Sequence, residues 1–462
     1  MSDDLHYLTI SELGRRFASG STTPTYVTEA LLERIGGLNP ALNAYVGVYR
    51  EAALAQARAA EQRAARSGWT PLLGVPLGLK DLYDVAGQPT RAGAVTTSAD
   101  PVVSDSWVTA ALASAGAVLI GKHNLHEYAL GVTNVNPHFG PVHNPWKRGH
   151  VPGGSSGGTG AAIGAGLCFG GFGSDTGGSI RIPSSLCGIA GIKPTHGRVS
   201  LRGVYPLSWA LDHAGPMARS VADCATLLSA VDGYDVEDPG CIDATRRPAS
   251  AGVGAGVAGL RVLIGEAYFL ETARSDVAEA VVAAAKVLEG LGAKLETVDL
   301  EGIGDLRGLN RDITLSEGAR FHAADLAERA HLIGADVLTR LRRGQAIAGT
   351  EYAAARRAGV EWRRRLERLL GDDAVLLTPT TRFPAPAIEG IDSVATADQL
   401  IAYTSPFNLI GTPALSVPCG FTTEGLPIGL QIVAAPWRDD LALQVGDSYE
   451  QATEWHRCHP SL

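Results

Sequence analysis

Residues 152–181 read P-G-G-S-S-G-G-T-G-A-A-I-G-A-G-L-C-F-G-G-F-G-S-D-T-G-G-S-I-R. This run holds two serines, Ser155 in its first glycine cluster and Ser179 in its second. Glycine gives the backbone conformations that are closed to other residues, and it lets bare N–H groups approach a bound molecule. A seryl nucleophile beside converging N–H donors is typical of acyl transfer. The run therefore predicts a site where a serine attacks a carbonyl group.

A lysine upstream is the expected partner of these serines. Lys80 ends an apolar, strand-like run over 74–80. Burial makes a charged lysine costly and favours the neutral amine, which can take a proton from a hydroxyl. We therefore interpret Lys80, Ser155 and Ser179 as one proton relay. The alternative is that Lys80 forms a buried ion pair with Asp81 or Asp84.

The stretch from Gly153 to Thr195 resembles the signature of the amidase signature family, and the similarity extends from about residue 5 to residue 455. It includes G-S-D-T-G-G-S-I-R at 173–181 and C-G-I-A-G-I-K-P-T at 187–195. The resemblance implies that Ser179 is the nucleophile, that Ser155 follows a cis peptide bond, and that Lys80 is the base. It also implies an oxyanion hole built from the backbone N–H groups of Thr176, Gly177, Gly178 and Ser179.

The resemblance extends to residues around this centre. Relatives line their acyl-binding channel at positions that align with Ala129, Leu130, Gly131 and Val132, and Trp209 is a further candidate. The apolar character of residues 129–132 favours an aryl or alkyl acyl group. Asp175 and Arg181 flank the nucleophile, and we expect them to form a structural ion pair or hydrogen bonds that fix the oxyanion loop.

Three other patterns suggest different sites. Residues 154–158 match G-x-S-x-G, the nucleophile elbow, with Ser156 in the central place, but the residues before it cannot form the core strand that the elbow requires. Residues 116–123 approach a phosphate-binding loop, yet His123 stands where Ser or Thr binds magnesium. The histidines between 123 and 150 lack the regular acidic partners of a metal site. We expect neither a metal nor a cofactor.

Composition restricts the class of protein. Lys and Arg number 39 and Asp and Glu number 48, so the net charge of −9 argues against nucleic acid as a partner. No run of 18 apolar residues suggests a membrane span. The start, Met1–His6, lacks the pattern of a signal peptide. With six scattered cysteines, which we expect to be reduced, these features favour a cytoplasmic protein.

The order of patterns predicts one compact α/β/α domain with a central mixed sheet covered by helices on both faces. Residues 1–70 read as a helical segment packed on the core, with one helix from Pro24 to Gly36-Gly37 and a second over 50–67. After Pro71, apolar strands alternate with helices through a catalytic domain that spans 71–462. An arginine-rich helical insertion at about 300–370 is either a solvated face or a lid over the substrate channel.

Together these features predict a stand-alone hydrolase, monomeric or homodimeric, that cleaves linear C–N bonds of small amides through an acyl-enzyme. Carbamates (urethanes) and esters pass through a similar tetrahedral intermediate and are further candidate substrates. The alternative is the A-subunit of a glutamyl/aspartyl-tRNA amidotransferase complex. That component usually carries a Met-Asp-Glu-Phe-type sequence where this chain has Leu-His-Glu-Tyr at 125–128.

Overall fold

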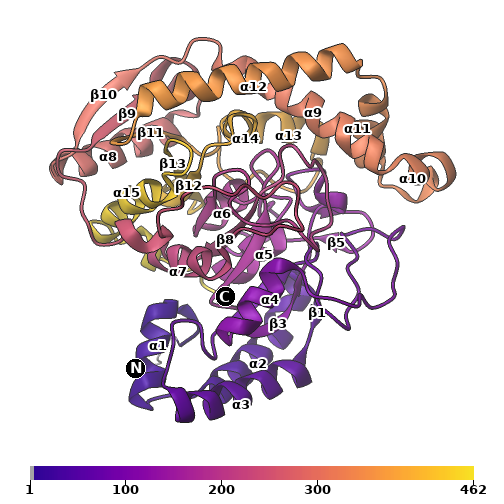
Figure 1. The fold of residues 1–462 in the computed structure, drawn as a ribbon, viewed down its shortest axis with the longest axis vertical. Coiled ribbons are helices and arrows are strands. Elements are labelled where there is room, and N and C mark those ends of the chain that lie inside the picture. The colour runs from indigo at the N-terminus through magenta and orange to yellow at the C-terminus, as the bar shows by residue number, and fades with distance from the viewer. Residues whose placement is uncertain (1–4) are drawn as a thin grey trace.

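A mixed sheet of 11 strands forms the centre of the molecule (Figure 1). The structure is a computed structural model, and it describes residues 5–462. The strand order is β1-β3-β2-β6-β8-β7-β12-β13-β11-β9-β10, and β4 and β5 form a separate two-stranded sheet. The strands are β1 (Tyr45–Val48), β2 (Pro76–Lys80), β3 (Val118–His123), β4 (Val135–Asn136), β5 (Gly140–Pro141), β6 (Gly170–Ser174), β7 (Ala190–Lys193), β8 (Ala214–Ala218), β9 (Arg261–Gly265), β10 (Lys294–Val298), β11 (Ala374–Pro379), β12 (Ala414–Phe421) and β13 (Pro427–Val433).

The sheet combines parallel pairs near its two ends with antiparallel pairs at its centre. β2 runs parallel to both of its neighbours, β3 and β6, and β9 runs parallel to β10 and β11. The remaining pairs are antiparallel. Leu79 of β2 lies opposite Phe172 of β6, so these two strands end at the same edge of the sheet. That edge carries Lys80 and Ser174.

Helices cover the sheet, as the sequence predicts. On one side α7, α8 and α15 pack on the strands, with α15 contacting both α7 and α8, while α5 and α6 pack together and contact β6, β12 and β13. The helices are α1 (Ile10–Ser19), α2 (Pro24–Leu42), α3 (Arg50–Ser67), α4 (Trp107–Ala115), α5 (Gly157–Gly164), α6 (Arg181–Cys187), α7 (Val221–Val231), α8 (Ser275–Gly290), α9 (Leu306–Phe321), α10 (Ala323–Glu328), α11 (Ala335–Gln345), α12 (Gly349–Leu370), α13 (Ser393–Leu400), α14 (Ser405–Ile410) and α15 (Asp439–Gln451). The predicted α/β fold with a mixed sheet is confirmed.

The N-terminal segment differs from its prediction in two ways. It is not entirely helical, because β1 adds an antiparallel edge strand to β3. α2 does not stop at Gly36-Gly37 but continues to Leu42, where Asn43 ends it in a left-handed conformation with φ of 56°. Burial of Ile35 and Leu42 against the core outweighs the low helix propensity of the two glycines between them. Residues 1–4, part of the start compared above with signal peptides, lie outside the described residues.

The region around 300–370 is helical, but it is divided into α9, α10, α11 and α12 rather than continuous. α9 packs against α11, α12 and α14, so these helices form one layer near the upper edge of Figure 1. Among residues 5–462, no helix combines the length and the apolar character that crossing a bilayer requires.

Candidate active site

Lys80 lies at the centre of a buried cluster of hydroxyl groups. Its Nζ donates a hydrogen bond to Ser155 Oγ at 2.6 Å and another to Ser174 Oγ at 2.8 Å. Lys80 and Ser155 are fully buried. The parallel strands β2 and β6 place Lys80 and Ser174 side by side, whereas Ser155 comes from the loop before α5. The structure thus brings the predicted base and the first predicted serine into contact.

Burial lowers the pKa of Lys80 to about 7, although the negative charges of Asp212 and Asp175 oppose the shift. The adjacent Asp81 does not pair with Lys80. Its carboxylate instead lies 3.1 Å from Nζ of Lys122, a second buried lysine. The alternative of a Lys80–Asp81 ion pair is therefore wrong, and Lys80 keeps an amine that is partly neutral near pH 7.

The peptide bond between Gly154 and Ser155 is cis, as the resemblance implied. The next residue, Ser156, is not the nucleophile of an elbow. No strand precedes it, and its Oγ donates to the Ser174 carbonyl oxygen at 3.2 Å inside the protein. Ser156 also donates its backbone N–H to the carbonyl oxygen of Ser179 at 3.3 Å, which joins the two glycine clusters directly.

Ser179 lies in the second cluster, between β6 and α6. Within residues 5–462, the backbone N–H groups of residues 176–179 have no hydrogen-bond acceptor, although the N–H groups of Asp175 and Ile180 on either side of them do. Four consecutive free donors around a serine are the arrangement that an oxyanion hole needs. The geometry thus fits the oxyanion hole implied for Thr176, Gly177, Gly178 and Ser179.

Distant segments hold this loop by its carbonyl oxygens. Asn408 donates to the oxygen of Asp175 at 2.9 Å, Asn310 to that of Thr176 at 3.2 Å, and Thr404 to that of Gly177 at 2.6 Å. Because side chains from other segments bind these three carbonyl groups, the N–H groups of residues 176–179 point toward the opposite side of the loop.

Gly178 permits the close approach of Thr404. Its φ is +140°, and a Cβ atom there would lie 2.3 Å from Thr404 Oγ1. A larger residue would therefore displace the segment that fixes the loop.

An ion pair between Asp175 and Arg181 lies under the loop, as predicted. Both side chains are fully buried, and Arg181 Nη2 is 2.9 Å from Asp175 Oδ1. Burial alone raises the pKa of Asp175, but the charge and hydrogen bonds of Arg181 lower it well below its usual range. Arg181 also donates to Gln431 at 2.7 Å and to Asn408 at 2.6 Å.

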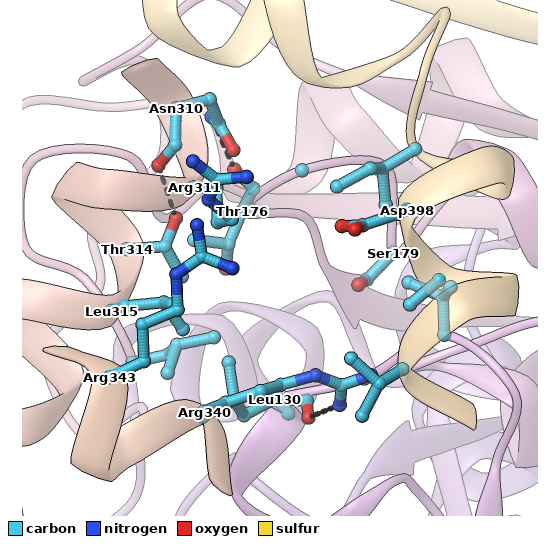
Figure 2. A pocket seen from close by; sticks show the side chains of 18 of the residues that line it. Leu130, Thr176, Ser179, Asn310, Arg311, Thr314, Leu315, Arg340, Arg343 and Asp398 are labelled. Atoms are coloured by element: carbon cyan, nitrogen blue, oxygen red, sulfur yellow. Dashed lines mark hydrogen bonds between the residues drawn. The ribbon is translucent and has the colours of Figure 1, made fainter. Parts of the chain in front are cut away.

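A cavity opens directly in front of Ser179 (Figure 2). It encloses about 790 Å³ of space, its mouth included. The predicted wall residues Ala129, Leu130, Gly131 and Val132 line it, as do Thr176 and Gly177. Trp209 does not: it is 52% exposed and lines a separate, smaller cavity beside His196 and His213. The turn that carries Trp209 is bound to α9, because Ser208 Oγ donates to Glu317 at 2.6 Å.

A family model described as Amidase matches residues 26–443. The chain belongs to the amidase signature family.

Relatives within this family cover almost the whole chain. The A-subunit of glutamyl-tRNA(Gln) amidotransferase from Pseudomonas putida (strain W619) is 37% identical over 485 residues, which include 99% of this chain and 100% of the relative. A solved structure from the work "An unexpected vestigial protein complex reveals the evolutionary origins of an s-triazine catabolic enzyme" matches with a TM-score of 0.91 and 36% identity, covering 96% of this chain and 98% of that chain. The structure of 6-aminohexanoate cyclic dimer hydrolase complexed with substrate matches with a TM-score of 0.88 and 29% identity, covering 99% of each chain.

Sequence reasoning missed two features of this amidase signature site. The first is Ser174, which contacts Lys80 because β6 pairs in parallel with β2. The second is the charge of the cavity wall opposite residues 129–132, where α9, α11 and α13 contribute Arg311, Arg340, Arg343 and Asp398. The three arginines lie in the segment at about 300–370, which we expected to be a solvated face or a lid, and Asp398 lies beyond it.

The histidines near the site pair with carboxylates of other elements. Nε2 of His126 is 2.9 Å from Asp336 of α11, and Nε2 of His138 is 2.7 Å from Glu127. Glu127 also accepts a hydrogen bond from the backbone N–H of Gly334, just before α11. These contacts attach α11 to the loop that forms the cavity wall.

Proposed function

We propose that the chain is an amide hydrolase that cleaves linear C–N bonds through an acyl-enzyme on Ser179. The observation that carries this proposal is the 2.6 Å contact between Lys80 Nζ and Ser155 Oγ, made by a lysine whose pKa is lowered to about 7. A base must be neutral to accept a proton, and at this pKa about half of the lysine is neutral at pH 7.

The mechanism uses the two serines in series. Neutral Lys80 accepts the proton of Ser155 as Ser155 accepts that of Ser179, and the Ser179 oxygen bonds to the amide carbon. The N–H groups of residues 176–179 stabilise the resulting oxyanion. The C–N bond then breaks, and the proton passes back through Ser155 to the leaving amine. Water, deprotonated by the same route, cleaves the ester and restores Ser179.

Among residues 5–462, no hydrogen bond joins the hydroxyl groups of Ser155 and Ser179, and the Ser155 hydroxyl instead contacts Lys80. Catalytic hydrogen bonds commonly shorten only in the complex with substrate. Carbamates (urethanes) and esters fit the same mechanism because their carbonyl groups pass through a similar intermediate. We propose that the protein acts on small molecules without needing another protein, as a monomer or homodimer.

A second candidate is supported by the relatives. The chain is 37% identical to the A-subunit of a glutamyl-tRNA(Gln) amidotransferase over nearly the full length of both proteins. In that role it would release ammonia within a complex. The Leu-His-Glu-Tyr sequence at 125–128 favours the stand-alone enzyme, because that subunit usually carries a Met-Asp-Glu-Phe-type sequence there.

The test is hydrolysis by the purified protein of a panel of aryl amides, aliphatic amides and carbamates, with Ser179→Ala as control. We expect amide cleavage by the chain alone and a loss of at least about 1,000-fold in the variant. Full activity in Ser179→Ala would refute the assigned nucleophile. Activity on glutamine that appears only when the other components of an amidotransferase complex are added would favour the second candidate.

A further inference from the structure

The cavity in front of Ser179 has two charged side chains that no neighbour holds by a hydrogen bond or ion pair among the described residues, although the charge of Asp398 also acts on the buried Arg340. Arg343 of α11 and Asp398 of α13 both line it, and neither side chain has a hydrogen bond or ion pair with another residue in the range 5–462. Figure 2 shows Arg343 entering from one side of the cavity and Asp398 on the other side, next to Ser179. Both charges therefore face the space that a substrate would fill.

The other two arginines of the cavity are already engaged. Nε and Nη2 of Arg311 each lie 3.0 Å from Asp312 Oδ1. Arg340 is buried and donates to the carbonyl oxygens of Leu130, at 2.6 Å, and Ser393, at 2.8 Å. These contacts leave Arg343 as the cation of the cavity lining that is free to bind a ligand.

We propose that the acyl group of the substrate carries a carboxylate, which Arg343 binds while Ser179 attacks the amide at the other end. This inference rests on the proposed amide hydrolysis and names its substrate class. A guanidinium donates two parallel hydrogen bonds to a carboxylate, and such pairs are strong when partly withdrawn from water. One free guanidinium matches the single charge of a carboxylate better than the double charge of a phosphate.

Asp398 orients the substrate within the cavity. Its negative charge repels a carboxylate from the side of the cavity that holds Ser179, and it can accept a hydrogen bond from an amide N–H there. The carboxylate consequently lies toward α11 and the reacting amide toward α6. Residues 129–132 contact the hydrocarbon segment between the two ends.

The first test compares ω-amido acids with neutral amides of the same carbon number. Malonamate, succinamate and glutaramate are paired with propionamide, butyramide and pentanamide, and kcat/KM is measured for each. Since a hydrogen bond to a charged group corresponds to about 10–100-fold in binding, we expect the best ω-amido acid to exceed its neutral partner by at least about tenfold. Equal or higher kcat/KM for all three neutral amides would overturn the proposal.

Variants of α11 assign the effect to one residue. Arg343→Gln is expected to reduce the preference for the ω-amido acid at least tenfold, mainly through KM. The neighbouring Arg342 is exposed, as Arg343 is, but it does not line the cavity, so Arg342→Gln is the matched control and should keep the wild-type preference. A preference that survives Arg343→Gln, or that Arg342→Gln removes equally, contradicts the assignment.

Binding measurements separate this inference from the proposed function. Calorimetry with the Ser179→Ala protein compares the binding of succinamate and butyramide without turnover. Tighter binding of succinamate supports the carboxylate site if the difference disappears in the double variant that also carries Arg343→Gln. Equal affinities would overturn it. Absence of turnover by the wild-type protein on every amide would instead overturn the proposed hydrolysis.

Discussion

The protonation state of one residue, Lys80, sets the expected pH dependence. Burial lowers its pKa to about 7, and only the neutral amine accepts the proton of Ser155. We therefore expect kcat/KM for amides to fall about tenfold per pH unit below pH 7 and to level off above it. Rate measurements between pH 5 and pH 9 test this. An acid limb centred near the ordinary lysine pKa of about 10.4 would contradict the proposed base.

Arg181 is the residue whose loss should cost the most stability. Arg181→Met leaves the carboxylate of Asp175 buried without its cation, and such changes cost about 3–5 kcal/mol. We expect a clear drop in the midpoint of urea unfolding. Arg357, in an exposed pair with Glu361, is the control, and Arg357→Met should change stability by at most about 1 kcal/mol. A similar loss of unfolding free energy in both variants would show that the buried Asp175–Arg181 pair stabilises the protein no more than the exposed pair does.

The proposed nucleophile, Ser179, and the proposed base, Lys80, could be predicted from the sequence, whereas the neighbouring Ser174 could not. Ser179 and Lys80 were identified from the glycine-rich run and the resemblance, because the chemistry requires these residue types. Ser174 was not, since its contact with Lys80 follows from the parallel pairing of β2 with β6, and pairing of distant strands leaves no mark in either strand alone.

Among the elements, α11 controls the shape of the cavity through Arg340. Its bonds to the carbonyl oxygens of Leu130 and Ser393 join the cavity wall to α13. We expect Arg340→Met to lower kcat/KM at least tenfold while the loss of unfolding free energy stays below about 3 kcal/mol. Steady-state kinetics and urea unfolding on the same samples measure both. Arg342→Met is the control, and an unchanged kcat/KM in Arg340→Met would exclude this positioning role.

Elements were predicted well where local pattern and burial agree. The strand β11 (Ala374–Pro379) belongs to the alternation of strands and helices expected after Pro71, and its six buried residues in succession admit few other structures. The short strand β1 was missed because its four residues lack clear alternation of buried and exposed positions, and only the pairing with β3 defines it.

For the whole molecule, the N-terminal segment is part of the core rather than an appendage. Ile10, Leu13 and Phe17 belong to the main hydrophobic cluster, and the backbone N–H of Ile10 donates to Asp223 of α7 at 2.9 Å. We therefore expect a chain that begins at residue 71 to be insoluble or unfolded. Circular dichroism and a protease digest of the truncated chain check this. A folded and active truncated protein would show that the first 70 residues form a separate unit.

The resemblance predicted the class of fold and the family from a single run, but it did not predict what surrounds the nucleophile. The cavity wall combines residues 129–132 with helices between 306 and 401, and Trp209 was misplaced because a tryptophan next to the site in sequence need not face it. The side chains of those helices line the cavity, whereas the sequence alone left open whether the segment at about 300–370 is a solvated face or a lid.

The outside anchoring of the loop at 175–179 has a consequence for biosynthesis. During translation Ser179, the proposed nucleophile, is synthesised long before Asn310, Thr404 and Asn408. These three side chains orient the peptide groups next to Ser179. A nascent or prematurely terminated chain thus carries the attacking hydroxyl without the means to stabilise charge on a carbonyl oxygen. Under the proposed function, we therefore expect hydrolytic competence only after nearly nine-tenths of the polypeptide has been made, so that incomplete copies do not cleave amides.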